Sequence, residues 1–255
     1  AGRLGPGHRR RYGDGQKYEL APRGVDRWMG HGETVGQCLR GPGILAPMIA
    51  PNPLLEAAVA AAQAAAALIR RAAADPASLQ VRRKHPNDFV TQVDLASQQA
   101  IASLLLGAFP NHALRGEESQ QLLGAAGADH VWIVDPLDGT TNFLHGIPLF
   151  AVAIALQRGE DIVASVIFNP IMDELYSAEK GGGAWLNDRK RLRVAVRKHL
   201  ADTVIVTGIN SQGRALDLLQ LKQLAQVTPA VAGIRRTGSA STDLAWLAAG
   251  RFDGY

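Results

Sequence analysis

The segment 135–143 combines residue types that could bind a metal ion and an anion. Asp135 and Asp138 lie three residues apart with a proline between them, so their carboxylates could converge on one side of a tight turn. Carboxylates and a backbone carbonyl are ligands that Mg²⁺ prefers, and such sites leave positions for water and a substrate phosphate. Gly139 lets the backbone come close to an anion, and the amides of Gly139 and Thr140 could face a phosphate if a helix begins there. The segment therefore predicts a place where a divalent cation and a phosphate meet.

An ordinary structural explanation competes with the metal hypothesis. Asp-Pro and Asp-Gly are common in turns, where the Asp side chain often only caps backbone amides. Two further acidic sites favour the metal site: Glu117 and Glu118 are adjacent in an expected loop, and Asp94 closes the polar segment 87–94. Adjacent acids repel one another unless they are solvated or bound to a cation.

The helices around these acids are predicted from periodicity. Apolar residues recur at helical spacing over residues 53–74, and this run ends before Pro76. A second helix should begin near Asp94, an acceptable N-cap, and stop before Pro110. The side chains expected to face inward from it are Leu95, Ile101, Leu104 and Leu105.

Strands and helices mix along the rest of the chain. Residues 131–134 form a short β-branched and aromatic run, which indicates a buried strand that ends at Asp135. Segments 150–156 and 162–168 indicate two more strands joined by a polar turn, and segments 214–226 and 241–249 have helical spacing. The pattern favours an α/β or α+β fold.

The net charge of +4 is confined to residues 1–47, which contain eight Lys or Arg and four acids. The remainder has nineteen residues of each sign and is formally neutral, so a basic face for nucleic acid is not indicated there. A nucleic-acid binder that uses Arg9, Arg10 and Arg11 is an alternative, although the acids and glycines around them favour a solvated tail. We expect residues 1–47 to be a disordered or non-native extension and residues 48–255 to be the folded body.

Cysteine content and hydropathy restrict the location of the protein. The only cysteine, Cys38, precedes the body, which can therefore form no internal disulfide and no thiolate zinc site. The apolar run 57–69 is shorter than the roughly 18 residues that a membrane span requires. The sequence predicts a cytoplasmic protein without a membrane span.

Four motifs of the body resemble those of the inositol monophosphatase family. They are segments 87–91 with Asp94, 116–119, 135–143 and 238–240, in the family's order and approximate spacing. The resemblance implies a layered αβαβα sandwich of the sugar-phosphatase type and a homodimer. It also implies Mg²⁺-dependent hydrolysis of a phosphate monoester on a polyol, with inositol 1-phosphate as the leading candidate. Thr140 and Thr141 differ from the Thr-Lys of nucleotide-directed relatives and the Ser-Ser of fructose bisphosphatases, so those substrates are less expected.

The resemblance also implies ligands for the metal ions. Glu117, Asp135 and the carbonyl of Leu137 look like ligands of a first Mg²⁺, and Asp135 and Asp138 look like ligands of a second. Asp94 is similar to an acid that helps to hold a weaker third ion.

The remaining roles concern the water and the substrate. Thr140 resembles the hydroxyl that positions the attacking water together with Glu117, and the amides of Gly139 and Thr140 are assigned to the phosphate. The residues that would line the alcohol side of the substrate are Gly238, Ser239 and Ala240.

The chain departs from the family pattern at its C-terminal side. The family continues beyond a segment like 252–255 to a Trp-Asp pair whose aspartate completes the second metal site. We therefore expect an incomplete C-terminus, a weakened second site and low activity. The alternatives are a catalytically weak member that acts as a binding or scaffold protein, and a phosphatase for another sugar phosphate.

Overall fold

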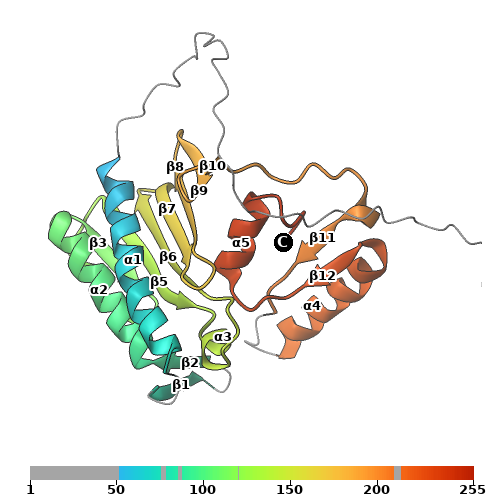
Figure 1. Cartoon of the computed structure of the whole chain (residues 1–255), viewed down its shortest axis with the longest axis horizontal. Coiled ribbons are helices and arrows are strands. Elements are labelled where there is room, and N and C mark those ends of the chain that lie inside the picture. Colours follow the sequence, from blue (N-terminus) through green and yellow to red (C-terminus); the bar gives the residue numbers. More distant parts are fainter. Residues whose placement is uncertain (1–51, 76–78, 86–87, 120, 210–213) are drawn as a thin grey trace, which may run out of the picture. The chain divides into compact units, whose positions relative to one another are not determined.

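The acidic segment 135–138 lies on an eight-stranded mixed sheet that has helices on both of its faces (Figure 1). The computed structural model describes residues 52–75, 79–85, 88–119, 121–209 and 214–255. The expectation for residues 1–47 lies outside these ranges. The strand order is β10-β9-β8-β7-β6-β5-β3-β4, and all neighbours are antiparallel except β3 and β5. The strands are β3 (Ala113–Gly116), β4 (Leu123–Gly124), β5 (His130–Asp138), β6 (Ala151–Arg158), β7 (Asp161–Asn169), β8 (Glu174–Glu179), β9 (Gly183–Leu186) and β10 (Lys190–Arg191).

The other elements form further layers beside this sheet. They are α1 (Pro53–Ala73), β1 (Val81–His85), β2 (Asp88–Thr91), α2 (Gln92–Ala108), α3 (Thr140–Leu144), β11 (Val204–Val206), α4 (Arg214–Val227), β12 (Gly233–Arg235) and α5 (Ala240–Ala248). In Figure 1, α1 and α2 cover one face of the large sheet, α5 covers the other, and the parallel pair β11–β12 and α4 follow beyond α5. The predicted α/β class with alternating layers is confirmed.

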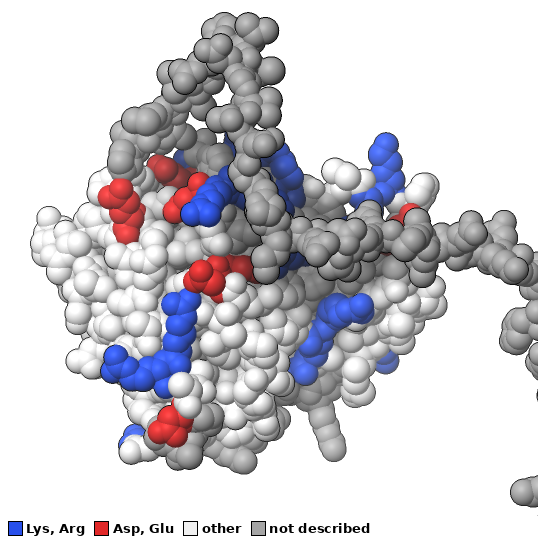
Figure 2. Space-filling view, in the orientation of Figure 1, with Lys and Arg blue, Asp and Glu red and all other residues white. Residues whose placement is uncertain are grey.

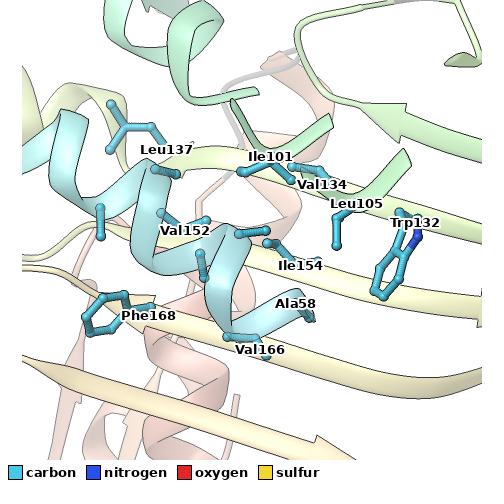
Figure 3. Packing of buried hydrophobic residues seen from close by; sticks show 14 of the residues in the cluster. Ala58, Ile101, Leu105, Trp132, Val134, Leu137, Val152, Ile154, Val166 and Phe168 are labelled. Carbon is cyan, nitrogen blue, oxygen red and sulfur yellow. The ribbon is translucent and has the colours of Figure 1, made fainter. Parts of the chain in front are cut away.

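Helix α1 packs on the sheet through its alanine face. It begins with Asn52 as N-cap, whose side chain accepts a hydrogen bond from the amide of Leu54, and Pro53 occupies the first turn. Its small buried side chains allow close approach to Val152, Ile154 and Val166, which are among the core residues in Figure 3. By length and composition α1 is the one described helix that could cross a membrane, but its buried face is that of a core helix.

The start of α2 differs from the prediction. Thr91, not Asp94, is the N-cap, and Asp94 occupies the third helical position. The two residues form a capping box, in which the amide of Thr91 donates to Oδ2 of Asp94 at 2.8 Å. Asp94 still lies at the beginning of a helix, but as the acidic partner of the cap.

The inward face of α2 was also partly mispredicted. Ile101 and Leu105 are fully buried as expected, whereas Leu95 and Leu104 are 48% and 46% exposed. Asp94 and Leu105 lie on the buried face of α2. Leu95 and Leu104 are their immediate neighbours in the sequence, so the side chains of these two leucines point away from that face. The polar residue Asp94 therefore takes the buried position that the apolar pattern had assigned to its neighbour Leu95.

Strand β5 extends further than its apolar run. The buried strand predicted over residues 131–134 is confirmed, but β5 continues to Asp138 instead of ending in a turn. Asp135 pairs with Ala153 and Asp138 with Ala151, so three steps along β5 match two along β6. This irregularity is a bulge, which changes the direction of side chains at a strand end.

A partly buried charge cluster joins β8 to α5 and the residues after it. The carboxylate of Glu174 accepts hydrogen bonds from the Arg251 guanidinium at 2.8 Å, the Tyr176 hydroxyl at 2.7 Å and the Trp246 indole at 3.1 Å. Burial acts to raise the pKa of Glu174, but these hydrogen bonds outweigh burial and lower it. The cluster fixes α5 against the sheet.

Replacing Glu174 by Gln should lower the free energy of unfolding by about 1 kcal/mol, because three donors lose their charged acceptor while the partly exposed Arg251 guanidinium can turn to water. Since the folded-state pKa of Glu174 is lowered, this contribution is fully present above the unfolded pKa of 4.5 and is lost as the pH falls through the lower folded-state pKa. Urea unfolding at pH 7 and at pH 3 to 4 measures the effect. Asp161→Asn, which removes an exposed ion pair with Lys180, should change stability by less than about 0.5 kcal/mol; equal effects of the two changes would contradict the prediction.

Candidate active site

Glu117 directly follows β3, and Asp135 lies on the neighbouring parallel strand β5, one residue beyond the partner of the last residue of β3. Gly116 at the end of β3 pairs with Val134 of β5, and the amide of Glu117 donates to the carbonyl of Val134 at 3.0 Å. Glu117 and Asp135 therefore each follow one member of a residue pair on neighbouring parallel strands. The two carboxylates are therefore brought together by the register of β3 on β5.

Asp135 lies among carboxylates. Burial, followed by the charges of Glu117 and then Asp138, raises the pKa of Asp135 to about 9. One Asp135 oxygen accepts a hydrogen bond from the amide of Leu137 at 3.1 Å. Burial and the two neighbouring acids favour the protonated form of Asp135. A bound cation would favour its ionised form instead.

Asp94 and Thr140 form the second part of the site. The hydroxyl of Thr140 lies 3.2 Å from Oδ1 of Asp94 and 3.1 Å from the carbonyl oxygen of Leu137. Burial raises the pKa of Asp94, while hydrogen bonds from Thr91 and Thr140 act in the opposite direction. The capping box of α2 thus places Asp94 against the threonine to which a catalytic role was assigned.

Asp138 connects β5 to the N-terminus of α5. Its Oδ2 atom accepts hydrogen bonds from the Ser239 hydroxyl at 2.8 Å, the Ser241 amide at 2.6 Å and the Ser241 hydroxyl. Ser239 is the N-cap of α5 and is fully buried. A carboxylate at a helix N-terminus is stabilised by the amides and by the helix dipole.

Two glycines allow the segment 135–143 and the residues just before α5 to approach one another closely. Gly139 has φ +94° and Gly238 has φ +90°, a region that favours glycine. A Cβ atom on Gly238 would lie 2.9 Å from the Asn142 side chain, whose amide donates to the carbonyls of Leu149 and Thr237 at 2.6 and 2.8 Å. Asn142 therefore holds α3 beside the loop that leads into α5.

Ser241, Asn142 and Asp243 contribute to this arrangement without having been predicted to do so. Asp243 accepts a hydrogen bond from Thr237, and burial raises its pKa. The presence of Ser241 two residues after the N-cap was a usable signal, because hydroxyls near a helix start often bind acids or amides. Three residues were predicted to line the alcohol side of the substrate. Gly238 and Ser239 face the segment 135–143, and Ala240 is the exposed first residue of α5.

The donor set fits a hard divalent cation. Glu117, Asp135, Asp138 and the Leu137 carbonyl offer oxygen ligands only, which suits Mg²⁺ and related ions. Within the described ranges no three His, Cys, Asp or Glu side chains converge at metal-binding distances. Asp138 is turned toward α5 and Asp94 toward Thr91, so the fit rests on the chemistry of the donors and on the repulsion at Asp135.

Comparison with known proteins identifies the chain's relatives. A model of the inositol monophosphatase family matches residues 50–255. Inositol-1-monophosphatase of Rhizobium meliloti is 51% identical over 207 residues, which cover 81% of this chain and 77% of that protein. Nus factor SuhB of Pseudomonas aeruginosa is 42% identical over 207 residues, covering 80% and 76%.

A solved structure agrees with the sequence matches. The extragenic suppressor protein SuhB from Bartonella henselae superposes with a TM-score of 0.75 and 45% identity, covering 79% of this chain and 77% of that one. The family match extends over the whole described body, including all four motifs. The chain belongs to the inositol monophosphatase family, a family of metal-dependent phosphatases.

Proposed function

We propose that this protein hydrolyses a phosphate monoester on a polyol, with inositol 1-phosphate as the first candidate and Mg²⁺ as the cofactor. The observation that carries the proposal is the environment of Asp135, whose pKa is raised to about 9 by burial and by the neighbouring charges of Glu117 and Asp138. A phosphate monoester is a dianion and would not approach three carboxylates without cations between them. The relatives named inositol-1-monophosphatase support the choice of substrate.

Each residue of the site has a proposed task. Glu117, Asp135, Asp138 and the Leu137 carbonyl would hold the cations, with Asp94 contributing to a weaker position. Bound Mg²⁺ would supply charge to the phosphate oxygens, a lowered pKa for a bound water and stabilisation of the leaving alkoxide. Gly139 permits the backbone to come close to the phosphate.

Thr140 orients the nucleophilic water in this proposal. Its hydroxyl can accept a hydrogen bond from water while it donates to Asp94 or to the Leu137 carbonyl. Asp94, held by Thr91, fixes the direction of that donation. The chain's own contribution is thus to hold a water and the substrate phosphorus in line.

Phosphate release in the full-length protein tests the proposal. Inositol 1-phosphate should be hydrolysed with Mg²⁺ and not with EDTA, and faster than AMP or fructose 1,6-bisphosphate. Preference for another sugar phosphate would keep the chemistry and change the substrate. Absence of hydrolysis with every monoester, in a folded protein that binds Mg²⁺, would refute the enzymatic function.

Replacing Thr140 by Ala should lower kcat by about 10- to 100-fold and change KM by less than about threefold, because the backbone amide survives the change. Thr140→Ser, which restores the hydroxyl, should recover most of the rate. Steady-state kinetics of both variants decide between two roles. A raised KM at unchanged kcat would make Thr140 a contact to the substrate instead.

We infer a cytoplasmic homodimer that acts on a small molecule, with no membrane partner. On the face shown in Figure 2, described Lys and Arg side chains occur in separate groups, several of them beside acids. On this face the described residues therefore offer no continuous basic path for nucleic acid.

A second role is supported by the relatives named Nus factor SuhB. A protein of that kind could act as a binding partner even with weak catalysis. A folded variant that has lost phosphatase activity separates catalysis from binding. Such a variant should still support the binding role if that role depends only on the protein surface.

A further inference from the structure

Gln98 is a buried polar residue on the helix that carries Asp94. It lies four residues after Asp94, so both side chains are on one face of α2, and Gln98 is only 7% exposed. Asp94 meets Thr140, whereas Gln98 meets the segment after β3. One helix face therefore contacts two separate parts of the site.

The contact between Gln98 and the Glu117 segment is specific. The amide of Glu118 donates to Oε1 of Gln98 at 3.0 Å. A Cβ atom built on Gly116 would lie 2.0 Å from the same Oε1 atom, closer than any side chain permits. Gly116 is not among the residues with a left-handed φ, so the position requires glycine for the space that Gln98 takes and not for its backbone conformation.

Glu117 is thereby fixed on both sides along the chain. Its own amide is bound to the carbonyl of Val134 on β5 at 3.0 Å, and the next amide is bound to Gln98 on α2. With both amides held, the Glu117 backbone has little freedom to move relative to Asp135. The loop on which a proposed metal ligand stands is thus locked between a strand and a helix.

We propose that Gln98 is a positioning residue that sets the place of the Glu117 carboxylate through the Glu118 amide. The consequence for catalysis rests on the proposed function, because Glu117 is assigned there to the cation. Gln98 touches neither substrate nor metal. Its effect passes through the backbone of residues 116–118.

Three variants of the full-length protein test this proposal. Gln98→Leu keeps the volume and removes the acceptor, and it should weaken Mg²⁺ binding by about 10- to 100-fold. Gln98→Glu keeps an oxygen acceptor for the Glu118 amide and should stay within about threefold of the unsubstituted protein. Gln99→Leu makes the same chemical change at an exposed position of α2 and should have less than about a twofold effect.

Two measurements read out these variants without relying on activity. Titration calorimetry gives the Mg²⁺ affinity, and hydrogen-exchange mass spectrometry gives the protection of the peptide that contains Glu118, which should fall in Gln98→Leu alone. If Gln98→Leu fails to fold, Gln98→Asn, whose acceptor is withdrawn by one methylene, should show the same loss of affinity.

The outcomes separate this inference from the proposed function. If the unsubstituted protein binds Mg²⁺ but releases no phosphate, the proposed phosphatase function is refuted. The role of Gln98 is then decided by comparing the Mg²⁺ affinities of Gln98→Leu and the unsubstituted protein. A Gln98→Leu variant with lowered melting temperature but unchanged Mg²⁺ affinity would overturn the positioning role. Failure of the unsubstituted protein to bind Mg²⁺ would overturn both.

Discussion

Asp138→Asn should lower kcat for phosphate monoesters by about 100-fold or more while the fold stays intact. Loss of a ligand charge removes several kcal/mol of interaction with a bound cation, and every 1.4 kcal/mol corresponds to about a tenfold change in rate. The fold should persist because Asn keeps an oxygen that can accept from Ser239 and Ser241, the contacts that Asp138 makes to α5. Kinetics at saturating Mg²⁺ measure the effect.

Asp129→Asn is the matched control for Asp138. It makes the same chemical change just before the other end of β5, at a side chain that is 66% exposed and forms an ion pair with Arg158. Its turnover should stay within about twofold of normal, since exposed ion pairs contribute little. Near-normal turnover of Asp138→Asn at limiting Mg²⁺ would remove Asp138 from the proposed metal site.

Asp135→Asn should abolish Mg²⁺-dependent turnover and at the same time stabilise the metal-free protein. Burial and the charges of Glu117 and Asp138 raise the pKa of Asp135 to about 9, so its ionised form is unfavourable in the folded state. At pH 8 in EDTA the variant should be more stable by roughly 1 to 3 kcal/mol. Added Mg²⁺ should stabilise the unsubstituted protein through binding and leave the variant unchanged.

The pH dependence gives the sign of this effect. Because the folded-state pKa is above the unfolded value of 3.8, the unsubstituted protein loses stability relative to the variant as the pH rises from about 4 through about 9. Urea unfolding in EDTA at pH 5 and pH 8 should therefore show a difference that grows with pH. A variant less stable than the unsubstituted protein at pH 8 would mean that the three acids do not repel.

The strongest periodic signals in the sequence predicted the fold well. The helix over residues 53–74 and the strand leading to Asp135 were recognised because burial imposes a regular apolar pattern on them. The start of α2 was misplaced because Thr91 and Asp94 are both good capping residues, and only the backbone shows which of them begins the helix. The predicted turn at Asp135 is a bulged strand for a similar reason: pairing with β6 is a long-range interaction that local residue types do not reveal.

The site was predictable to the level of residue types and not of contacts. The acids were found because their clustering is costly and their motif resembles a known family, and their assignment as ligands stays a prediction. The contacts from Asp138 to Ser239 and Ser241 were not foreseen, because they join residues about a hundred positions apart. Gln98 could have been noticed from its spacing of four residues after Asp94, although the same spacing occurs on any helix.

The attachment of Asp138 to α5 has a consequence for protein synthesis. The hydrogen bonds to Ser239 and Ser241 span 101 and 103 residues, whereas that between Thr140 and Asp94 spans 46. On the ribosome, β3 and β5 can pair as soon as both have emerged, but Asp138 has no partner on α5 until some hundred further residues have been translated. During synthesis the strand that carries Asp135 and Asp138 can therefore form before the hydrogen bonds that hold Asp138 to α5 become available.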